Sequence, residues 1–187
     1  MPHMAGADDE SKLIERSLSG DPEAYAALVN RHQHMVRAVA FRMTGSFDDS
    51  EELAQEAFVR AYKQLGSFGG ASKFSTWLCK IVINLSLDWR RRESRRAGIH
   101  ASWAVEAMSE QGPDGGFPDE LSRRVQVALD RLPVKQRAAI VLTIYENQSH
   151  AEAARTLGCA EATISWRVFA ARQKLKRLLK DLPHEQP

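Results

Sequence analysis

Cysteine is scarce in this sequence: Cys79 and Cys159 are the only two among 187 residues, and they lie far apart. Such a pair argues against a disulfide framework, so we interpret both as small apolar residues in a reducing cytoplasm. His32 and His34 stand two positions apart and point to different sides of a helix, and neither HExxH nor CxxC occurs. The sequence therefore predicts no metal site and no cofactor.

Long apolar runs and catalytic motifs are also missing. No stretch approaches the roughly 20 apolar residues that span a bilayer. The N-terminal MPHMAGADDE lacks the basic-then-apolar order of a signal peptide, so we expect a cytoplasmic protein without membrane insertion. There is no phosphate-binding GxxxxGK and no Ser/His/Asp set in a recognisable context. Nothing here requires an enzyme, and we predict no catalytic residues.

Helical periodicity is frequent, whereas strand signals are scarce. DPEAYAALVNRHQHMVRAVAFRM begins with Asp21 as an N-cap and Pro22 at the first helical position, and Thr44-Gly45 ends the pattern. A second helical pattern, DDSEELAQEAFVRAYKQL, carries acidic residues in its first turn. A third, from Phe74 to Arg96, is apolar as far as Leu87 and then basic. These patterns predict an all-α fold.

An acidic segment divides the chain. From Ala101 to Glu120 there is no Lys or Arg, and prolines and glycines argue against a continuous element. Its acidic residues are Glu106, Glu110, Asp114, Asp119 and Glu120. We interpret it as a flexible tether between two small helical domains. The predicted boundaries are a flexible leader with the start of the first helix at 1–20, a first domain at 21–98, the linker at 99–120 and a second domain at 121–181.

The second domain ends in a helix-turn-helix pattern with its turn at Gly158. In TISWRVFAARQKLKRLL one narrow stripe predicts the core: Ile164, Val168, Ala171, Leu175 and Leu178. Trp166 and Phe169 fall on the opposite face, where their own domain cannot cover them, so they require a partner. The alternative is a helix buried on two sides, with a basic end that is merely solvated.

A basic patch ends the first domain, next to several aromatic residues. Its arginines are Arg90, Arg91, Arg92, Arg95 and Arg96, and the aromatics around the GGASK loop are Phe68, Phe74, Trp77 and Trp89. Aromatics beside a basic groove suit stacking on unpaired bases. Taken singly, Phe74 and Trp77 are better interpreted as core and the arginines as a solvated helix end. The combination favours nucleic-acid binding.

Three motifs in order resemble the compact extracytoplasmic-function (ECF) group of bacterial sigma-70 factors. DDSEELAQEAFVRAY is similar to the segment that grips RNA polymerase, and GSFGGASKFSTWLCKIVINLSLDWRRRESRR to the promoter-melting segment that reads the −10 element. RLPVKQRAAIVL with the helix-turn-helix resembles the −35-binding domain. The resemblance covers Asp21 to Leu179 and implies a region 2-like bundle, a region 4-like helix-turn-helix domain and promoter recognition for a dedicated, stress-responsive regulon.

The resemblance also implies site residues and partners. Contacts to core polymerase, at the beta-prime clamp helices, would come from Glu52, Leu53, Gln55 and Glu56. The −10 DNA would meet Gly69, Gly70, Ala71, Ser72, Lys73, Phe74, Trp77, Asn84, Asp88, Arg91 and Arg92. The −35 DNA would meet Thr163, Ser165, Trp166, Arg167, Phe169, Ala170 and Arg172. The other expected partners are the beta flap of polymerase and an anti-sigma factor. If the anti-sigma factor is a membrane protein, it would hold the chain at the inner membrane. No obligate homo-oligomer is expected.

The recognition helix departs from the family pattern at Ser165, Trp166 and Ala170. Cationic side chains are missing there, and arginine bidentate to guanine is the commonest specific base contact. We therefore expect altered −35 reading, with Trp166 pressing on thymine methyls or on a protein. Two alternatives stay open: a free-standing helix-turn-helix regulator that acts without polymerase, and a sigma-like protein whose last helix binds a protein partner.

Overall fold

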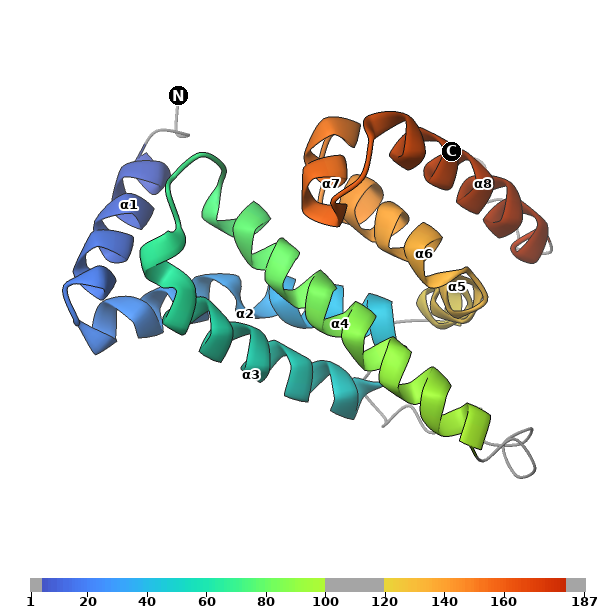
Figure 1. The fold of residues 1–187 in the computed structure, drawn as a ribbon, viewed down its shortest axis with the longest axis horizontal. Helices are drawn as coiled ribbons and strands as arrows, with labels where there is room; N and C mark the ends of the chain where they lie inside the picture. The colour runs from blue at the N-terminus through green and yellow to red at the C-terminus, as the bar shows by residue number, and fades with distance from the viewer. Residues whose placement is uncertain (1–4, 100–119, 181–187) are drawn as a thin grey trace.

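The computed structural model describes residues 5–99 and 120–180, and their regular elements are all helices, without a strand (Figure 1). The all-α prediction is therefore confirmed. The N-terminal half contains α1 (Ala5–Leu18), α2 (Pro22–Thr44), α3 (Phe47–Gln64), the short η1 (Leu65–Ser67) and α4 (Phe74–Ile99). The C-terminal half contains α5 (Glu120–Asp130), α6 (Val134–Ile140), its continuation η2 (Val141–Tyr145), α7 (His150–Leu157) and α8 (Glu161–Leu178). Apart from its ends, the predicted acidic linker lies outside the described residues.

Local signals at the two ends of α2 act as predicted. Asp21 is the N-cap, and its Oδ1 accepts hydrogen bonds from the backbone N–H of Glu23 at 2.9 Å and of Ala24 at 3.2 Å. Gly45 ends the helix with a φ of 79°, a left-handed conformation that glycine adopts without a steric penalty. This C-cap aims the chain directly into α3, which packs along α2.

Substituting Gly45 tests a close approach between the two halves of the molecule. A Cβ at this position would lie 2.6 Å from Oδ2 of Asp130. We expect Gly45→Ala to lower the free energy of unfolding by more than the roughly 1–2 kcal/mol of left-handed strain alone. Gly20→Ala is the matched control, because Gly20 has a φ of 91° and no atom within 4 Å of its Cβ position. Equal losses in urea unfolding of both variants would contradict the close approach.

A helix occupies the segment expected to be a flexible leader. Ile14 of α1 is buried against the core, and Oε1 of Glu10 lies 2.8 Å from Nε2 of His32 on α2. Asp9 and Arg31 form a second ion pair between the same helices. Residues 5–18 of the segment predicted as a flexible leader with the start of the first helix are therefore helical. Leu13 and Ile14 supply the apolar side of this helix that contacts the core.

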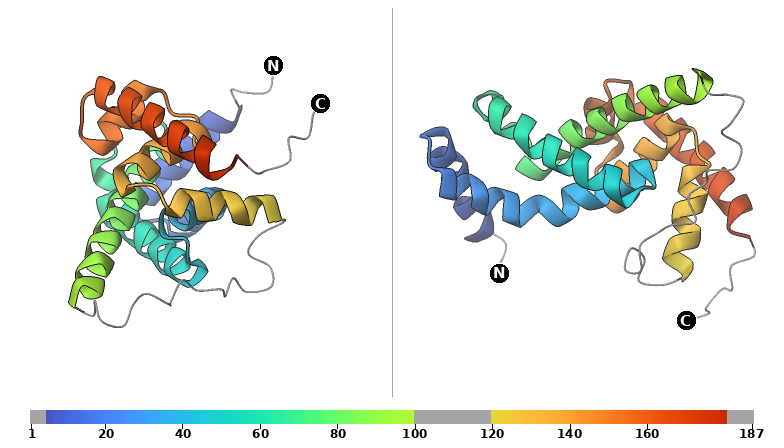
Figure 2. Two further views of the ribbon diagram at one scale, coloured as in Figure 1. Left: turned by 90° about the vertical axis from the view of Figure 1, so that its right-hand side faces the viewer. Right: turned by 90° about the horizontal axis from the view of Figure 1, so that it is seen from below.

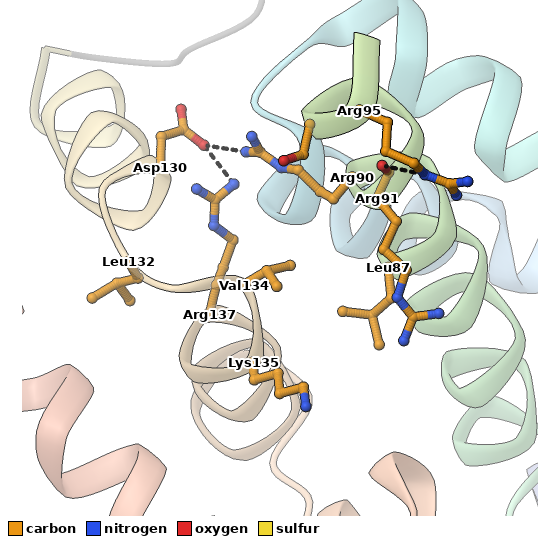
Figure 3. Close-up of a pocket in the computed structure, with 10 residues that line it drawn as sticks. Leu87, Arg90, Arg91, Arg95, Asp130, Leu132, Val134, Lys135 and Arg137 are labelled. Atoms are coloured by element: carbon orange, nitrogen blue, oxygen red, sulfur yellow. Dashed lines mark hydrogen bonds and ion pairs between the residues drawn. The ribbon is translucent and has the colours of Figure 1, made fainter. Parts of the chain in front are cut away.

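The C-terminal half packs on α4 and on the C-terminal end of α2 (Figures 1 and 2). At this contact lies a cluster of three charged residues, Arg90, Asp130 and Arg137, which we call the interdomain ion cluster (Figure 3). Nη1 of Arg137 donates to Oδ1 of Asp130 at 2.7 Å and to the carbonyl of Met43 at 2.8 Å. Nη2 of Arg90 donates to the carbonyl of Thr44 at 3.1 Å and lies 3.5 Å from Oδ1 of Asp130.

Burial dominates the electrostatics of this cluster. Arg137 is 1% exposed, and burial lowers its pKa to about 10, which leaves it cationic at neutral pH. Burial also raises the pKa of Asp130, against the attraction of Arg137 and Arg90. The two guanidinium groups meet the last carbonyls of α2, where the helix dipole favours positive charge. The cluster thus links α4, α5 and α6 to the end of α2.

A second contact joins the halves near the start of α4. The Cys79 thiol lies 3.9 Å from Oε2 of Glu146, and the Arg42 guanidinium lies 4.1 Å from the centre of the Tyr145 ring. Cys79 is buried, and burial raises the pKa of its thiol. The prediction that Cys79 acts as a small buried residue is therefore confirmed.

Within residues 5–99 and 120–180, no helix has the length and apolar character needed to cross a bilayer.

Candidate nucleic-acid interface

An acidic face runs along α3. Ser46 caps the helix by accepting a hydrogen bond from the backbone N–H of Asp49 at 3.3 Å. Glu52 and Gln55 are exposed, and half-buried Glu56 forms an ion pair with Arg60 at 2.6 Å. Three of the four residues predicted to contact polymerase therefore share an accessible surface.

Leu53 does not belong to that surface. It is 3% exposed and packs in the core, because it continues inward with Ala57 and Ala61 at steps of four residues. Its inclusion among the polymerase contacts is corrected accordingly. Val59 and Tyr62 extend the face instead, with exposed fractions of 53% and 52%. The sequence interpretation did not assign either of them to this face. Exposed apolar residues next to acidic ones suit a protein partner.

The loop before α4 stands over a cluster of aromatic rings. Gly69 to Lys73 are exposed, and Gly70 has a φ of 71°. Phe74 is 2% exposed, so it is a core residue, and its ring supports Trp77 at a centroid distance of 5.5 Å. Phe68 lies 5.4 Å from both rings and, like Trp77, remains partly accessible. The loop is thus accessible and adjoins partly accessible rings, a type of surface on which unpaired bases can stack.

One face of α4 carries the polar residues that the sequence assigned to −10 DNA. Asn84, Asp88 and Arg91 are exposed and follow one another at helical spacing, with Arg91 bonded to Asp88 at 2.9 Å. Arg92 beside them is also exposed. Lys80 continues the same face toward the loop, a residue that the sequence interpretation missed although its spacing of four from Asn84 could have revealed it.

Two members of the predicted basic and aromatic patch serve the fold. Arg90 is engaged with main-chain carbonyls and Asp130 in the interdomain ion cluster. Trp89 donates its indole N–H to Oδ1 of Asp49 at 3.1 Å and so ties α4 to the start of α3. Neither side chain is free to meet phosphates or bases, whereas four arginines further along α4 are exposed: Arg91, Arg92, Arg95 and Arg96.

The helix-turn-helix is built from local signals. Ser149 and Glu152 form a capping box at the start of α7, and Gly158 ends it with a φ of 60°. Ile164, Val168 and Ala171 of α8 are buried, as the stripe predicts. Leu175 and Leu178 are partly exposed.

Trp166 and Phe169 project from α8 into solvent. Their exposed fractions are 62% and 63%, so the alternative of a helix buried on two sides does not hold among the described residues. Arg172 is exposed on the same helix, while Thr163 and Ala170 are half-buried. Large exposed aromatic residues on a recognition helix mark a contact surface.

The remaining predicted −35 residues have partners within the motif. Oγ of Ser165 lies 2.9 Å from Nδ1 of His150 and donates to the carbonyl of Glu161 at 3.2 Å. Nη1 of Arg167 lies 3.5 Å from Sγ of Cys159, next to the turn. These contacts hold α7 and the turn against α8. His150 was not singled out from the sequence, because its position beside Ser165 depends on the turn geometry.

Comparisons with known proteins agree with the order of these surfaces. Residues 28–96 match the family Sigma-70 region 2, and residues 122–175 match Sigma-70, region 4. The ECF RNA polymerase sigma factor SigW of Bacillus subtilis is 33% identical over 91% of this chain and 97% of its own length. The RNA polymerase sigma-H factor of Pseudomonas aeruginosa is 30% identical over 97% of this chain and all of its own length.

A solved structure extends the similarity to the arrangement of helices. The sigma factor RpoE in complex with the anti-sigma factor NepR, from Bartonella quintana, superposes with a TM-score of 0.71 and 28% sequence identity. The match covers 85% of this chain and 98% of that sigma factor.

Proposed function

The chain belongs to the ECF group of sigma-70 factors, and on that premise we propose that it directs core RNA polymerase to one dedicated, stress-responsive set of promoters. The observation that carries the proposal is that three exposed surfaces follow the chain in the family's order. They are the acidic face of α3, the loop with α4, and the outer face of α8.

The face of α3 is proposed to bind the beta-prime clamp helices of core polymerase. Glu52 and Glu56 supply its charge, Gln55 a neutral polar group, and Val59 and Tyr62 apolar contact next to them. The C-terminal half is proposed to contact the beta flap. Charged residues around an apolar centre give a protein interface both specificity and a fast association rate.

The loop and α4 are proposed to open and read the −10 element. The loop from Gly69 to Lys73 would hold a flipped base, with Trp77 as its support. Asn84, Asp88, Arg91 and Arg92 would lie along the DNA, with Lys80 on the same face of α4. Stacking on an aromatic ring is worth about 1–3 kcal/mol per base, which offsets part of the cost of unstacking it.

Substitutions in the two halves should alter different parts of the promoter. We would transcribe a genomic fragment library with core polymerase and the purified chain, and then sequence the transcript ends. The expected result is a pair of boxes at fixed spacing. Lys73→Ala should change use of the downstream box only, and Phe169→Ala use of the upstream box only. A single box, or both variants acting on the same box, would contradict the assignment of one half to each element.

Trp166 is proposed to read thymine in the upstream box. Its exposed ring offers apolar surface where the family commonly has a cation, and thymine is the only base with a methyl group in the major groove. Replacing the contacted thymine by uracil removes that methyl group, and about 0.8 kcal/mol per buried carbon predicts roughly fourfold weaker binding.

Trp166→Ala should bind less tightly and lose the difference between thymine and uracil. The measurement is fluorescence anisotropy of the polymerase complex on the mapped promoter. Thymines outside the upstream box serve as the control. A thymine preference that survives in Trp166→Ala would contradict direct reading by this ring.

The exposure of Trp166 and Phe169 also favours a second candidate, in which α8 binds a protein. Trp166→Ser should then leave promoter affinity unchanged and weaken a protein complex.

An anti-sigma factor is the proposed partner that keeps the chain inactive, because the similar RpoE is described in complex with one. The proposed location is the cytoplasm, with retention at the inner membrane where the anti-sigma factor is itself a membrane protein.

A further inference from the structure

The two halves of the molecule form a cavity between α4 and α6 (Figure 3). Its volume is about 590 Å³, within the range of roughly 300–1,000 Å³ that is typical of small-molecule sites. A cavity of this size cannot admit duplex DNA, whose recognition uses extended surfaces. Of its lining residues, only Arg91 takes part in the proposed promoter contacts.

Positive charge is concentrated in this cavity. Five cationic side chains line it together with a single carboxylate, Asp130; they are Arg90, Arg91, Arg95, Lys135 and Arg137. Arg90 and Arg137 share Asp130, and Arg91 pairs with Asp88. Arg95 and Lys135 are exposed and have no carboxylate partner among the described residues, so no ion pair offsets their charge at the cavity. This excess of cationic side chains over carboxylates favours an anion with more than one negative charge.

Arg137 lies behind the wall of the cavity and is almost fully enclosed by protein. Nε of Arg137 is buried and makes no hydrogen bond, although the residue is only 1% exposed. An unsatisfied buried donor is costly, and a donor of a charged group more so than a neutral one. Because this atom is not accessible, the charge that can meet a ligand in the cavity comes from the exposed cations Arg95 and Lys135.

Apart from Ser94, the rest of the wall is apolar. Leu87 comes from α4, Leu132 from the turn between α5 and α6, and Val134 from the start of α6 (Figure 3). A phosphate ion alone makes no favourable contact with an apolar surface. A nucleotide combines a polyanionic end with a flat, largely apolar base that can pack on it. We propose that the cavity binds a nucleoside di- or triphosphate, with its phosphates at Arg95 and Lys135 and its base against the apolar wall.

The site consists of residues from both halves, so it exists only while they are packed together. A bound nucleotide should therefore stabilise the packed arrangement by mass action. The inference does not depend on the proposed function, because neither polymerase nor promoter DNA takes part in it.

The test uses the full chain, free of divalent cations, in isothermal titration with ATP, GTP, tripolyphosphate and adenosine. We expect one nucleotide bound per chain, and weaker or no binding of tripolyphosphate and of adenosine. Lys135→Gln and Arg95→Gln should each weaken nucleotide binding about tenfold, as the loss of one charge-assisted hydrogen bond predicts. Lys12→Gln, on exposed α1, is the matched control with the same loss of charge and should bind as the unmodified chain does.

Three results would overturn the proposal. Absence of binding by both nucleotides contradicts the site itself. Equal weakening in Lys12→Gln and in the two cavity variants means general attraction of anions to a basic chain. Tripolyphosphate binding as tightly as the nucleotides contradicts the role of the apolar wall.

Discussion

Asp130→Ala is expected to separate the two halves of the molecule. The substitution leaves Arg137 buried and cationic close to Arg90, with no carboxylate between them. Removing one partner of a buried ion pair costs about 3–5 kcal/mol. Separation of the two halves lowers that cost, because water can then hydrate the arginines. Small-angle X-ray scattering should therefore show a larger radius of gyration, and urea should unfold the variant at a lower concentration.

Two further variants give this expectation its controls. Glu120→Ala breaks an exposed ion pair with Arg123 on the same helix, so the radius should not change. Adding Arg137→Met to Asp130→Ala removes the stranded charge and should restore packing, since apolar residues of similar volume replace buried ion pairs well. An unchanged radius and unfolding midpoint in Asp130→Ala would contradict the role of the interdomain ion cluster.

Reversing the charge of the α3 face should abolish binding to core polymerase. Glu52→Lys/Glu56→Lys replaces two accessible carboxylates by ammonium groups while the buried stripe of the helix stays intact. Placing like charges opposite each other costs several kcal/mol, which corresponds to at least a hundredfold loss of affinity. Co-purification of core polymerase with the tagged chain, followed by a titration, measures the effect.

The matched control for this reversal is Glu15→Lys/Glu23→Lys. Both residues are exposed on α1 and α2, away from the α3 face, and the change in net charge is the same. Polymerase should bind this control as it binds the unmodified chain. If the α3 variant also retains polymerase, the chain acts on DNA alone, and the free-standing helix-turn-helix regulator becomes the better account.

Local signals in the sequence predicted the helices and the inward faces well. Asp21 and Gly45 define α2 through contacts within a few residues, and the stripe through Ile164 and Val168 correctly separated the core from the exposed face of α8. The spacing of Leu53 also predicted a buried side chain. Its assignment to the polymerase contacts was an error, because that role was carried over from the family by motif position. Periodicity therefore deserves more weight than resemblance when the two disagree about one side chain.

Contacts between the halves could not be predicted in this way. Arg90 and Asp130 are far apart in sequence with the acidic segment between them, and no spacing rule links them. The burial of Arg137 runs against the usual preference of arginine and becomes possible only through Asp130 and the Met43 carbonyl. The cavity between α4 and α6 follows from the same packing. The roles of individual residues toward polymerase and promoter DNA stay predictions, because exposure shows which side chains are accessible but not what they bind.

Transcription from purified components tests the central claim most directly. Core polymerase, with and without the chain, would be supplied with genomic fragments of the source organism, and the transcript starts would be mapped. The account predicts transcripts that depend on the chain and begin downstream of one shared pair of sequence boxes. If core polymerase with the chain yields no promoter-dependent transcript on any fragment, the chain is not a promoter-specificity subunit.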